Sequence, residues 1–323
     1  MKPKVFVARP IPIEVEQYIA EHCEVEKWLG EDTIPRAELL KAVQQVEGLL
    51  TTGGRIDGEL LDHAPHLKVV SNISVGYNNF DLEAMKARKI LGTNTPYVLD
   101  NTVADLVMGL ILSTARRIPE LDQYVKNGQW RRGDDEVLFG VDVHHSTLGI
   151  IGLGRIGEAI ARRAKLGFDM NVLYHNRSPK TEVEQSLGIR PASLDDLLAQ
   201  SDFVVLMTPL TPETTHLMGR EEFEKMKDTA IFINASRGKT VDEQALIEAL
   251  ETKQIRGAGL DVYEREPIAS DHPFLKMPQV VTLPHIGSST AKTRLDMAKT
   301  AAKNLVMAVT GEVPPNVVKE LLT

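Results

Sequence analysis

A short glycine-rich segment near the middle of this chain limits, more than any other feature, which folds the chain can adopt. Residues 152–157 read Gly-Leu-Gly-Arg-Ile-Gly, directly after the apolar run Thr147–Ile151 and directly before the helix-forming run Glu158–Ala164. In such a strand–turn–helix unit the first glycine permits a tight turn, the second lets the backbone approach a pyrophosphate, and the third allows the helix to pack closely on the strand. The spacing predicts a dinucleotide cradle at Gly152, Gly154 and Gly157, the alternative being a glycine-rich turn without a ligand.

Apolar runs alternate with helical stretches over the whole of its 323 residues, as in α/β proteins built on parallel sheets. We therefore expect two doubly wound parallel-sheet domains, of which the second, with six strands, is a Rossmann-type dinucleotide domain. The first set of strands is expected at 4–8, 48–52, 67–71 and 90–91, with helices near 13–22 and 36–46. The second set is expected at 147–151, 171–174, 203–207, 230–234, 258–261 and 280–283.

Two long helical patterns lie between and after these sets. The first, Thr102–Ile118, opens with a capping-box-like Thr102-x-x-Asp105, and we expect Pro119 to end it. The second, Ser289–Val309, stops at Gly311 and can carry the chain back to the first set. The predicted division is thus a discontinuous domain of residues 1–99 and 288–323, and a dinucleotide-binding domain of residues 100–287.

The end of the second strand of the dinucleotide domain bears on cofactor choice. An acid there would accept hydrogen bonds from the ribose 2′-hydroxyl of NAD, but the sequence has Asn176, followed by Arg177 and Ser178, which can donate to a 2′-phosphate. We expect NADP to be preferred and NAD still to be used. The alternative is that Arg177 and Lys180 are solvated surface charges.

Three reactive side chains follow strands of the second set. Arg237, Glu266 and His285 come after the strands at 230–234, 258–261 and 280–283. Since ligands bind at the carboxyl edge of an open parallel sheet, we expect the three side chains to converge beside the dinucleotide cradle. Taken singly, each has a structural alternative: a surface ion pair, a solvated acid and a partly buried histidine.

Composition excludes several classes of protein and site. The formal net charge is −8 with no dense basic run, which disfavours nucleic acid as a partner. The longest apolar run, near 106–112, is far below the roughly 18 residues that a membrane helix needs, and no secretory segment opens the chain. Cys23 is the only cysteine, which excludes an intrachain disulfide and a cysteine-based zinc cluster and fits a cytoplasmic location. We expect no metal.

The chain resembles the D-isomer-specific 2-hydroxyacid dehydrogenases over its whole length, and within them it is most similar to the glyoxylate/hydroxypyruvate and 2-ketogluconate reductases. Five motifs carry the resemblance: Ser74–Tyr77, Gly152–Gly157, Asn234–Gly238, Gly259–Val262 with Glu266-Pro267, and Leu283–Ser288. Several independent motifs in the same order are more specific than any one of them.

The resemblance implies a nicotinamide-dependent reduction of small 2-keto acids to D-2-hydroxy acids. Arg237 would hold the substrate carboxylate and keto oxygen, His285 would donate the proton, and Glu266 would stabilise the charged imidazole. The discontinuous domain would be a smaller, flavodoxin-like substrate domain, with the active site in the cleft between the domains. Its Val75 and Gly76 amides would bind the carboxylate, with a further polar contact from Ser288.

The resemblance also implies a set of cofactor contacts and a homodimer. The loop Gly133–Gly140, which contains Val137-Leu138-Phe139, falls where relatives build a dimer-crossing arm; otherwise it is a mobile surface loop. Besides the glycines and residues 176–178, the implied cofactor contacts are Thr102, Leu153, Arg155, Ile156, Thr208, Pro209, Thr214, Ala235, Ser236, Arg237, Asp261, His285 and Gly287.

Two other functions are compatible with the same scaffold. One is a dinucleotide-sensing, corepressor-like binding protein, because fold does not determine function. The other is an NAD-dependent phosphoglycerate dehydrogenase, which the absence of an acid at Asn176 disfavours. The sequence leaves open which 2-keto acid is the physiological substrate.

Overall fold

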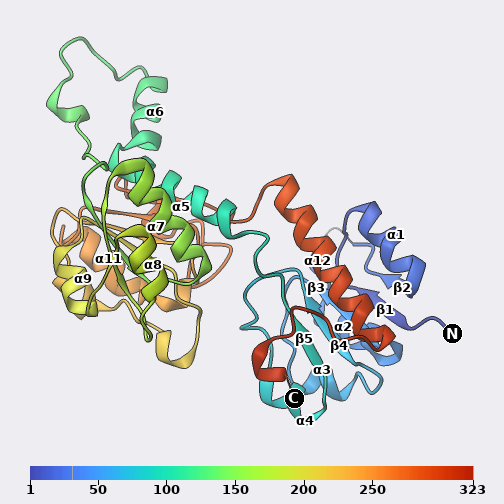
Figure 1. The fold of residues 1–323 in the computed structure, drawn as a ribbon. Coiled ribbons are helices and arrows are strands. Elements are labelled where there is room, and N and C mark those ends of the chain that lie inside the picture. The colour runs from blue at the N-terminus through green and yellow to red at the C-terminus, as the bar shows by residue number, and fades with distance from the viewer. Residues whose placement is uncertain (31, 323) are drawn as a thin grey trace. The chain divides into compact units, whose positions relative to one another are not determined.

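The structure is a computed structural model that describes residues 1–30 and 32–322. The chain divides into two compact units, which we call unit 1 (Met1–Leu99 with Ser289–Thr323) and unit 2 (Asp100–Ser288). The chain therefore leaves unit 1, builds unit 2 and returns (Figure 1). The second crossing comes after Ser288, one residue later than the boundary that we expected from the sequence.

Unit 1 is built on a five-stranded parallel sheet with the order β2-β1-β3-β4-β5. The order runs in opposite directions from β1, so the sheet is doubly wound with the flavodoxin-like arrangement that we predicted. Every residue of β3 and β4 is buried, whereas β2 lies at an edge and is largely exposed. The strands are β1 (Lys4–Val7), β2 (Glu24–Lys27), β3 (Gly48–Thr51), β4 (Val69–Asn72) and β5 (Leu91–Thr93).

Helices cover this sheet and close the core of unit 1. The two helices α1 and α12 contact each other, and α12 also lies against β3, β4 and β5 (Figure 1). Thr290 caps the start of α12, and Gly311, with φ +94°, ends it as predicted. The helices are α1 (Ile13–His22), α2 (Arg36–Ala42), α3 (Gly58–Asp62), α4 (Leu82–Ala87) and α12 (Ala291–Thr310).

Unit 2 is built on a seven-stranded parallel sheet with the order β12-β11-β10-β9-β6-β7-β8. The order reverses between β6 and β9, which is the switch point where such sheets bind dinucleotides. The strands are β6 (Thr147–Ile151), β7 (Asn171–His175), β8 (Arg190–Pro191), β9 (Phe203–Leu206), β10 (Ile231–Asn234), β11 (Gly257–Leu260) and β12 (Val280–Thr282). The predicted fold class, two doubly wound parallel sheets, is confirmed.

The helices of unit 2 bury apolar faces on both sides of that sheet. The longest, α5, lies against α7, β10, β11 and β12. A second cluster of buried side chains, which includes Phe223, Phe232 and Leu246, lies under α10 and α11. The helices are α5 (Asp100–Ala115), α6 (Ile118–Lys126), α7 (Arg155–Phe168), α8 (Thr181–Leu187), α9 (Leu194–Gln200), α10 (Arg220–Lys225) and α11 (Glu243–Glu251). Within residues 1–30 and 32–322, no helix combines the length and apolar character that crossing a membrane requires.

The predicted bounds of the helix at 102–118 were wrong at both ends. The helix begins at Asp100, which places Thr102 in its first turn rather than at its cap. It ends at Ala115, and Arg117 then adopts a left-handed conformation with φ +55°. Pro119 does not end α5 but lies in the first turn of the next helix, α6, where a missing amide costs no hydrogen bond.

Candidate functional site

The glycine-rich segment forms a cradle at the switch point of unit 2. Gly152 has φ +103°, and a Cβ there would lie 2.8 Å from the carbonyl carbon of Met207. At Gly157 a Cβ would lie 2.5 Å from the carbonyl oxygen of Gly152, so α7 approaches β6 closely. A Cβ at Gly154, by contrast, would meet no atom within 4 Å. The open space at Gly154, at the N-terminus of α7, fits a pyrophosphate bound by helix amides.

Of two polar side chains at the rim of the cradle, one is hydrogen-bonded to the protein and the other is not. The Asn176 side chain is engaged with the cradle itself: its Oδ1 accepts from the Leu153 amide at 2.6 Å, and its Nδ2 donates to the Leu153 carbonyl at 3.3 Å. The Thr208 hydroxyl oxygen is buried, and no hydrogen-bond partner for it occurs among residues 1–30 and 32–322. An unpaired buried hydroxyl is costly unless a ligand satisfies it, so Thr208 supports a polar ligand at this edge.

Several other predicted cofactor contacts use their polar groups inside the protein. The Thr214 hydroxyl donates to the Pro209 carbonyl at 2.6 Å, and the Ser236 hydroxyl donates to Asn234 Oδ1 at 2.9 Å. Leu153 is fully buried, so only its backbone lies at the cradle. Arg155 Nε is 3.0 Å from Asp100 Oδ2, which ties the cradle to the start of α5.

The segment after β7 presents two of its predicted cofactor contacts to solvent. Arg177 and Ser178 are exposed, whereas Lys180 Nζ is 3.1 Å from Glu158 Oε1 and is thus occupied by an ion pair. The pKa of Glu213 lies below its ordinary value, chiefly because the Thr211 hydroxyl donates a hydrogen bond to its carboxylate. The positive charge of Arg177 lowers this pKa further, so Arg177 lies near Glu213.

Arg237, Glu266 and His285 all follow strands at the carboxyl edge of the unit 2 sheet. They come after β10, β11 and β12, which are neighbours in the sheet. His285 Nδ1 lies 2.7 Å from Glu266 Oε2, and the second carboxylate oxygen, Oε1, accepts from the Tyr263 amide at 3.1 Å. A carboxylate can only accept, so Nδ1 carries the proton and Nε2 is left for another partner.

The charges of these groups depend on one another. Burial raises the pKa of Glu266, but hydrogen bonds from His285 and the Tyr263 amide, with the charges of His285 and Arg237, outweigh it and leave that pKa below its ordinary value. Burial lowers the pKa of Arg237, and the charge of Glu266 only partly offsets this. Because a guanidinium stays protonated in proteins, Arg237 is a partly desolvated cation that an anionic ligand would stabilise.

Asp261 holds the backbone that follows His285. This carboxylate is 1% exposed, and it accepts from the Ile286 amide at 2.7 Å and from the Gly287 amide at 2.8 Å. Burial raises the pKa of Asp261 despite these bonds. His285 itself has φ +52°, a conformation that a residue with a side chain adopts only where its surroundings enforce it. Asp261 therefore supports the backbone beside His285. The cofactor contact that the resemblance implies for Asp261 stays a prediction.

Gly238 was missed as a site residue, although it stands in a motif that we singled out. A Cβ at this position would lie 1.8 Å from the carbonyl carbon of Tyr263, so the loops that carry Arg237 and Glu266 touch through their backbones. The glycine directly after Arg237 was the available signal, since an unexplained glycine beside a functional residue often marks a close approach of two backbones.

In unit 1, Val75 and Gly76 lie in the loop after β4, and asparagine side chains fix that loop. Asn94 Nδ2 donates to the Val75 carbonyl at 2.7 Å, and Asn72 Nδ2 donates to Asn79 Oδ1 at 2.8 Å. Asn79 Nδ2 in turn donates to the Gly54 carbonyl at 3.0 Å. These bonds engage carbonyls and side chains and do not use the Val75 and Gly76 amides.

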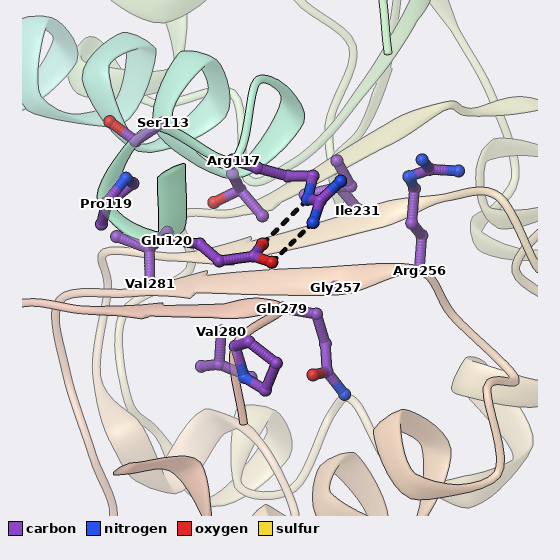
Figure 2. Close-up of a pocket in the computed structure, with 12 residues that line it drawn as sticks. Ser113, Arg117, Pro119, Glu120, Ile231, Arg256, Gly257, Gln279, Val280 and Val281 are labelled. Atoms are coloured by element: carbon purple, nitrogen blue, oxygen red, sulfur yellow. Dashed lines mark hydrogen bonds and ion pairs between the residues drawn. The ribbon is translucent and has the colours of Figure 1, made fainter. Parts of the chain in front are cut away.

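A cavity of about 220 Å³ lies at the opposite, amino edge of the unit 2 sheet. Figure 2 shows the Arg117–Glu120 ion pair beside it, with Nε 2.8 Å from Oε2, above the starts of β11 and β12. None of the predicted site residues lines this cavity, so it adds no catalytic candidate. Within the described part of the chain, no cluster of three or more histidine, cysteine or acidic side chains could hold a metal ion.

Comparison with known proteins places the chain in a family. Residues 108–287 match the family described as D-isomer specific 2-hydroxyacid dehydrogenase, NAD binding domain. A glyoxylate/hydroxypyruvate reductase B of Yersinia pestis (strain Pestoides F) is 50% identical over 318 residues, which cover 98% of each chain.

Solved structures agree with this over the same length. An NADPH-dependent glyoxylate/hydroxypyruvate reductase from Sinorhizobium meliloti, in complex with NADP and malonate, is 32% identical, with a TM-score of 0.88 over 99% of this chain and 98% of the other. A glyoxylate reductase from Paecilomyes thermophila is 30% identical, with a TM-score of 0.90 over 99% of each chain. The chain therefore belongs to the D-isomer specific 2-hydroxyacid dehydrogenases, a family of NAD(P)-dependent oxidoreductases.

Proposed function

We propose that this protein reduces small 2-keto acids, among them glyoxylate, hydroxypyruvate and 2-ketogluconate, to D-2-hydroxy acids. The observation that carries the proposal is the hydrogen bond between His285 and Glu266 at the same sheet edge as Arg237. The relatives named as glyoxylate/hydroxypyruvate reductases support this substrate class over a phosphoglycerate dehydrogenase or a corepressor.

In this proposal His285 is the proton donor. Its Nδ1 proton is held by Glu266, so the imidazole is oriented with Nε2 toward the keto oxygen, and the carboxylate stabilises the positive charge of the doubly protonated ring. A nicotinamide cofactor, when bound at the cradle of Gly152, Gly154 and Gly157, would supply the hydride. As charge develops on the keto oxygen, Nε2 gives up its proton and Glu266 keeps the neutral ring in place.

Arg237 binds the substrate carboxylate and keto oxygen through its planar guanidinium. Its Nη1 donates to the Ser236 carbonyl at 2.7 Å, which fixes the orientation of the group. Partial desolvation makes each hydrogen bond from this cation to an anionic substrate stronger than it would be in water. We assign the Val75 and Gly76 amides of unit 1 to the same carboxylate and Ser288 to a further polar contact.

Steady-state kinetics test this assignment. Wild-type protein should reduce glyoxylate with NADPH, and absence of turnover would leave the binding-protein alternative. Arg237→Lys keeps the positive charge but loses the planar guanidinium that binds a carboxylate through two parallel hydrogen bonds. We therefore expect kcat/KM for glyoxylate to fall by about two orders of magnitude, which corresponds to about 3 kcal/mol of transition-state binding. The NADPH dissociation constant should change much less; a defect confined to cofactor affinity would contradict the role of Arg237.

We also propose that NADPH is preferred over NADH. Arg177 and Ser178 are exposed at the end of β7 and can donate to a 2′-phosphate, and no acid competes at position 176. Because Asn176 holds Leu153 with both of its polar groups, the test leaves Asn176 unchanged. Arg177→Ala should lower the NADPH/NADH ratio of kcat/KM by about 10-fold or more, whereas exposed Arg256→Ala at the other sheet edge should not.

We propose, finally, that the protein is a homodimer through an arm formed by residues 118–140. No residue of α6 is buried, and Figure 1 shows α6 and the following loop projecting from the rest of unit 2. The arm exposes Trp130 (64%), Val137 (62%) and Phe139 (58%). Arg117 nevertheless fixes its shape by donating to the Val137 carbonyl at 2.7 Å and the Phe139 carbonyl at 3.2 Å. Apolar side chains held in an ordered, uncovered arm favour a second copy as the partner.

Sedimentation measurements test the dimer. The wild type should sediment as a dimer, and Trp130→Glu with Phe139→Glu should shift it toward monomer. Leu166→Glu, at an equally exposed position on α7, is the matched control. A monomeric wild type would overturn the proposal, as would a dimer that the double variant does not weaken.

A further inference from the structure

Glu266 lies in a long loop between β11 and the short 3₁₀ helix Pro273–Lys276. Residues 261–272, all of which the structure describes, contain no helix and no strand. The Tyr263 amide that binds Glu266 belongs to the same loop, so this hydrogen bond fixes the side chain relative to the loop and not the loop relative to the sheet. The distance between Glu266 and His285 therefore depends on what holds the loop in place.

One carboxylate outside the predicted site, Glu243, binds this loop at two points. Its Oε2 accepts from the Glu264 amide at 3.1 Å, and its Oε1 lies 3.0 Å from Nε2 of His272. In the chain, Glu264 comes before Glu266 and His272 comes after it. The same carboxylate thus holds the loop on both sides of Glu266.

The hydrogen bonds of His272 determine which of its nitrogens carries the proton. The Phe274 amide donates to Nδ1 at 3.3 Å, so Nδ1 is an acceptor and Nε2 carries the proton. Nε2 therefore donates to Oε1 of Glu243, while the Glu264 amide donates to Oε2. Both oxygens of Glu243 must accept, which a carboxylate does and an amide side chain cannot do.

Glu243 is well placed to hold the loop, because it is shielded from water and stands on a packed helix. The side chains of Glu243 and His272 are 18% and 16% exposed. Glu243 is the first residue of α11, where a negative charge is favourable, and α11 buries Leu246 and Leu250 in the core of unit 2. Hydrogen bonds to an ionised group that is shielded in this way are stronger than in water.

We propose that Glu243 is a positioning residue for the reduction: through Glu264 and His272 it holds the loop so that Glu266 stays on Nδ1 of His285. The inference rests on the proposed function, because it assigns a further residue to the same reaction. Without Glu243 the loop would also adopt arrangements in which Glu266 leaves His285, and only molecules that keep this bond would have an oriented imidazole.

Glu243→Gln tests the proposal with little change in shape. The amide keeps one acceptor but turns an NH2 group toward either Glu264 or His272. With NADPH, kcat for glyoxylate should fall about 10-fold, as expected for the loss of one hydrogen bond to a charged group. KM should change by less than about 2-fold, because Arg237 keeps its hydrogen bond to the Ser236 carbonyl.

Glu222→Gln is the matched control. Glu222 Oε2 accepts from the Gly219 amide at 3.1 Å at the start of α10, the helix that contacts α11, so the substitution is chemically the same. This hydrogen bond does not involve residues 261–272, and kcat should stay at the wild-type value. A fall in kcat like that of Glu243→Gln would overturn the proposal.

A double-mutant cycle with Glu266 separates positioning from a general effect on the fold. If Glu243 acts through Glu266, Glu243→Gln should lower kcat by less than about 2-fold in protein that already carries Glu266→Gln. A loss of about 10-fold in both backgrounds would mean that the two residues act independently, and the positioning role would be wrong.

His272 provides a second test, which decides the matter if Glu243→Gln does not fold. His272→Leu removes the donor to Glu243, whereas His272→Gln places an amide NH2 group within similar reach. We expect kcat to fall in His272→Leu and to stay close to the wild-type value in His272→Gln. Equal kcat values in the two variants would contradict the proposal.

The outcomes distinguish this inference from the proposed function. If the wild type does not reduce glyoxylate, the proposed function fails. If it does, but Glu243→Gln keeps the wild-type kcat or its loss adds to that of Glu266→Gln, the positioning role is wrong and the proposed function stands.

Discussion

At the scale of single residues, the orientation of His285 depends on Asp261. Both carboxylate oxygens of Asp261 accept backbone amides, from Ile286 and Gly287, directly after the histidine. Asp261→Asn replaces one acceptor by an NH2 group that faces an amide. We expect this variant to lose about 1–3 kcal/mol of stability, because one buried donor remains unsatisfied. It should also lose kcat, since the left-handed conformation of His285 loses its support.

Denaturant unfolding and glyoxylate kinetics measure both effects. The control is Asp195→Asn, which removes an exposed ion-pair partner of Lys225. A normal kcat in a destabilised Asp261→Asn protein would show that Asp261 supports the fold and not the histidine.

The lowered pKa of Glu266 implies that the stability of the protein depends on pH. Its pKa lies below the ordinary value in the folded protein, so the ionised form stabilises the fold. That contribution is complete above the pKa of an unfolded glutamate, about 4.3, and is lost as the pH falls through the lower folded value. Glu266→Gln should therefore be less stable than the wild type at pH 7, and the difference should shrink in acid. Free energies of unfolding at both pH values measure this, and a constant difference would contradict it.

The same variant has a kinetic readout. Without the carboxylate, the imidazole of His285 loses the group that holds its Nδ1 proton, so Glu266→Gln should reduce glyoxylate with a lower kcat than the wild type. Glyoxylate kinetics at pH 7 measure this. An unchanged kcat would confine Glu266 to a structural role.

The sequence predicted which residues of unit 2 follow neighbouring strands, but not what their side chains bind. The positions of Arg237, Glu266 and His285 follow from counting strands, because the ends of parallel strands meet at one edge. The roles of Asn176 and Asp261 could not be read in this way. Both bind backbone groups in loops that follow other strands, and such bonds depend on loop conformations that no local pattern specifies.

At the scale of elements, a substitution in the turn between β6 and α7 should weaken NADPH binding without changing the stability of the fold. A Cβ at Gly154 would meet no described atom within 4 Å, and the φ of −86° at this position suits any residue. Gly154→Ala should therefore leave stability within about 0.5 kcal/mol of the wild type. It should still raise the NADPH dissociation constant by about 10-fold or more, because the added methyl group occupies the approach to the pyrophosphate.

Calorimetric titration with NADPH measures the binding side of this prediction. Gly167→Ala is the control, since its Cβ also meets no atom and it lies in α7 away from the cradle. Equal NADPH affinity in both variants would mean that no phosphate lies over Gly154.

The elements that the sequence did not predict share a physical cause. The edge strand β2 reads Glu-Val-Glu-Lys and is largely exposed, and β8 has two residues, so neither has a buried face that leaves an apolar pattern. Pro119 was read as the end of α5, but proline is equally suited to the first turn of α6. The buried strands and α12 were predicted because each must present apolar side chains to a core.

At the scale of the whole molecule, each unit has its own core, and the chain crosses between the units twice. The core cluster of unit 1 includes Leu49, Val70 and Met85, and that of unit 2 includes Phe232 and Leu246. The predicted cofactor cradle and the Arg237, Glu266 and His285 group lie entirely in unit 2. Unit 1, in contrast, needs both ends of the chain.

The contribution of α12 to unit 1 yields the last prediction. The helix buries Met297, Ala301, Leu305 and Val309, and its Ala301 carbonyl accepts from the Ser71 hydroxyl of β4 at 2.8 Å. Burial of each large apolar side chain contributes about 1.5–3 kcal/mol, so together they approach the 5–15 kcal/mol that stabilises a whole domain. Removal of residues 289–323 should therefore unfold unit 1 while unit 2 stays folded and binds NADPH. Hydrogen exchange should show fast exchange in β1, β3 and β4 and slow exchange in β6, β9 and β10. Protection of unit 1 without α12 would show that its first 99 residues fold alone.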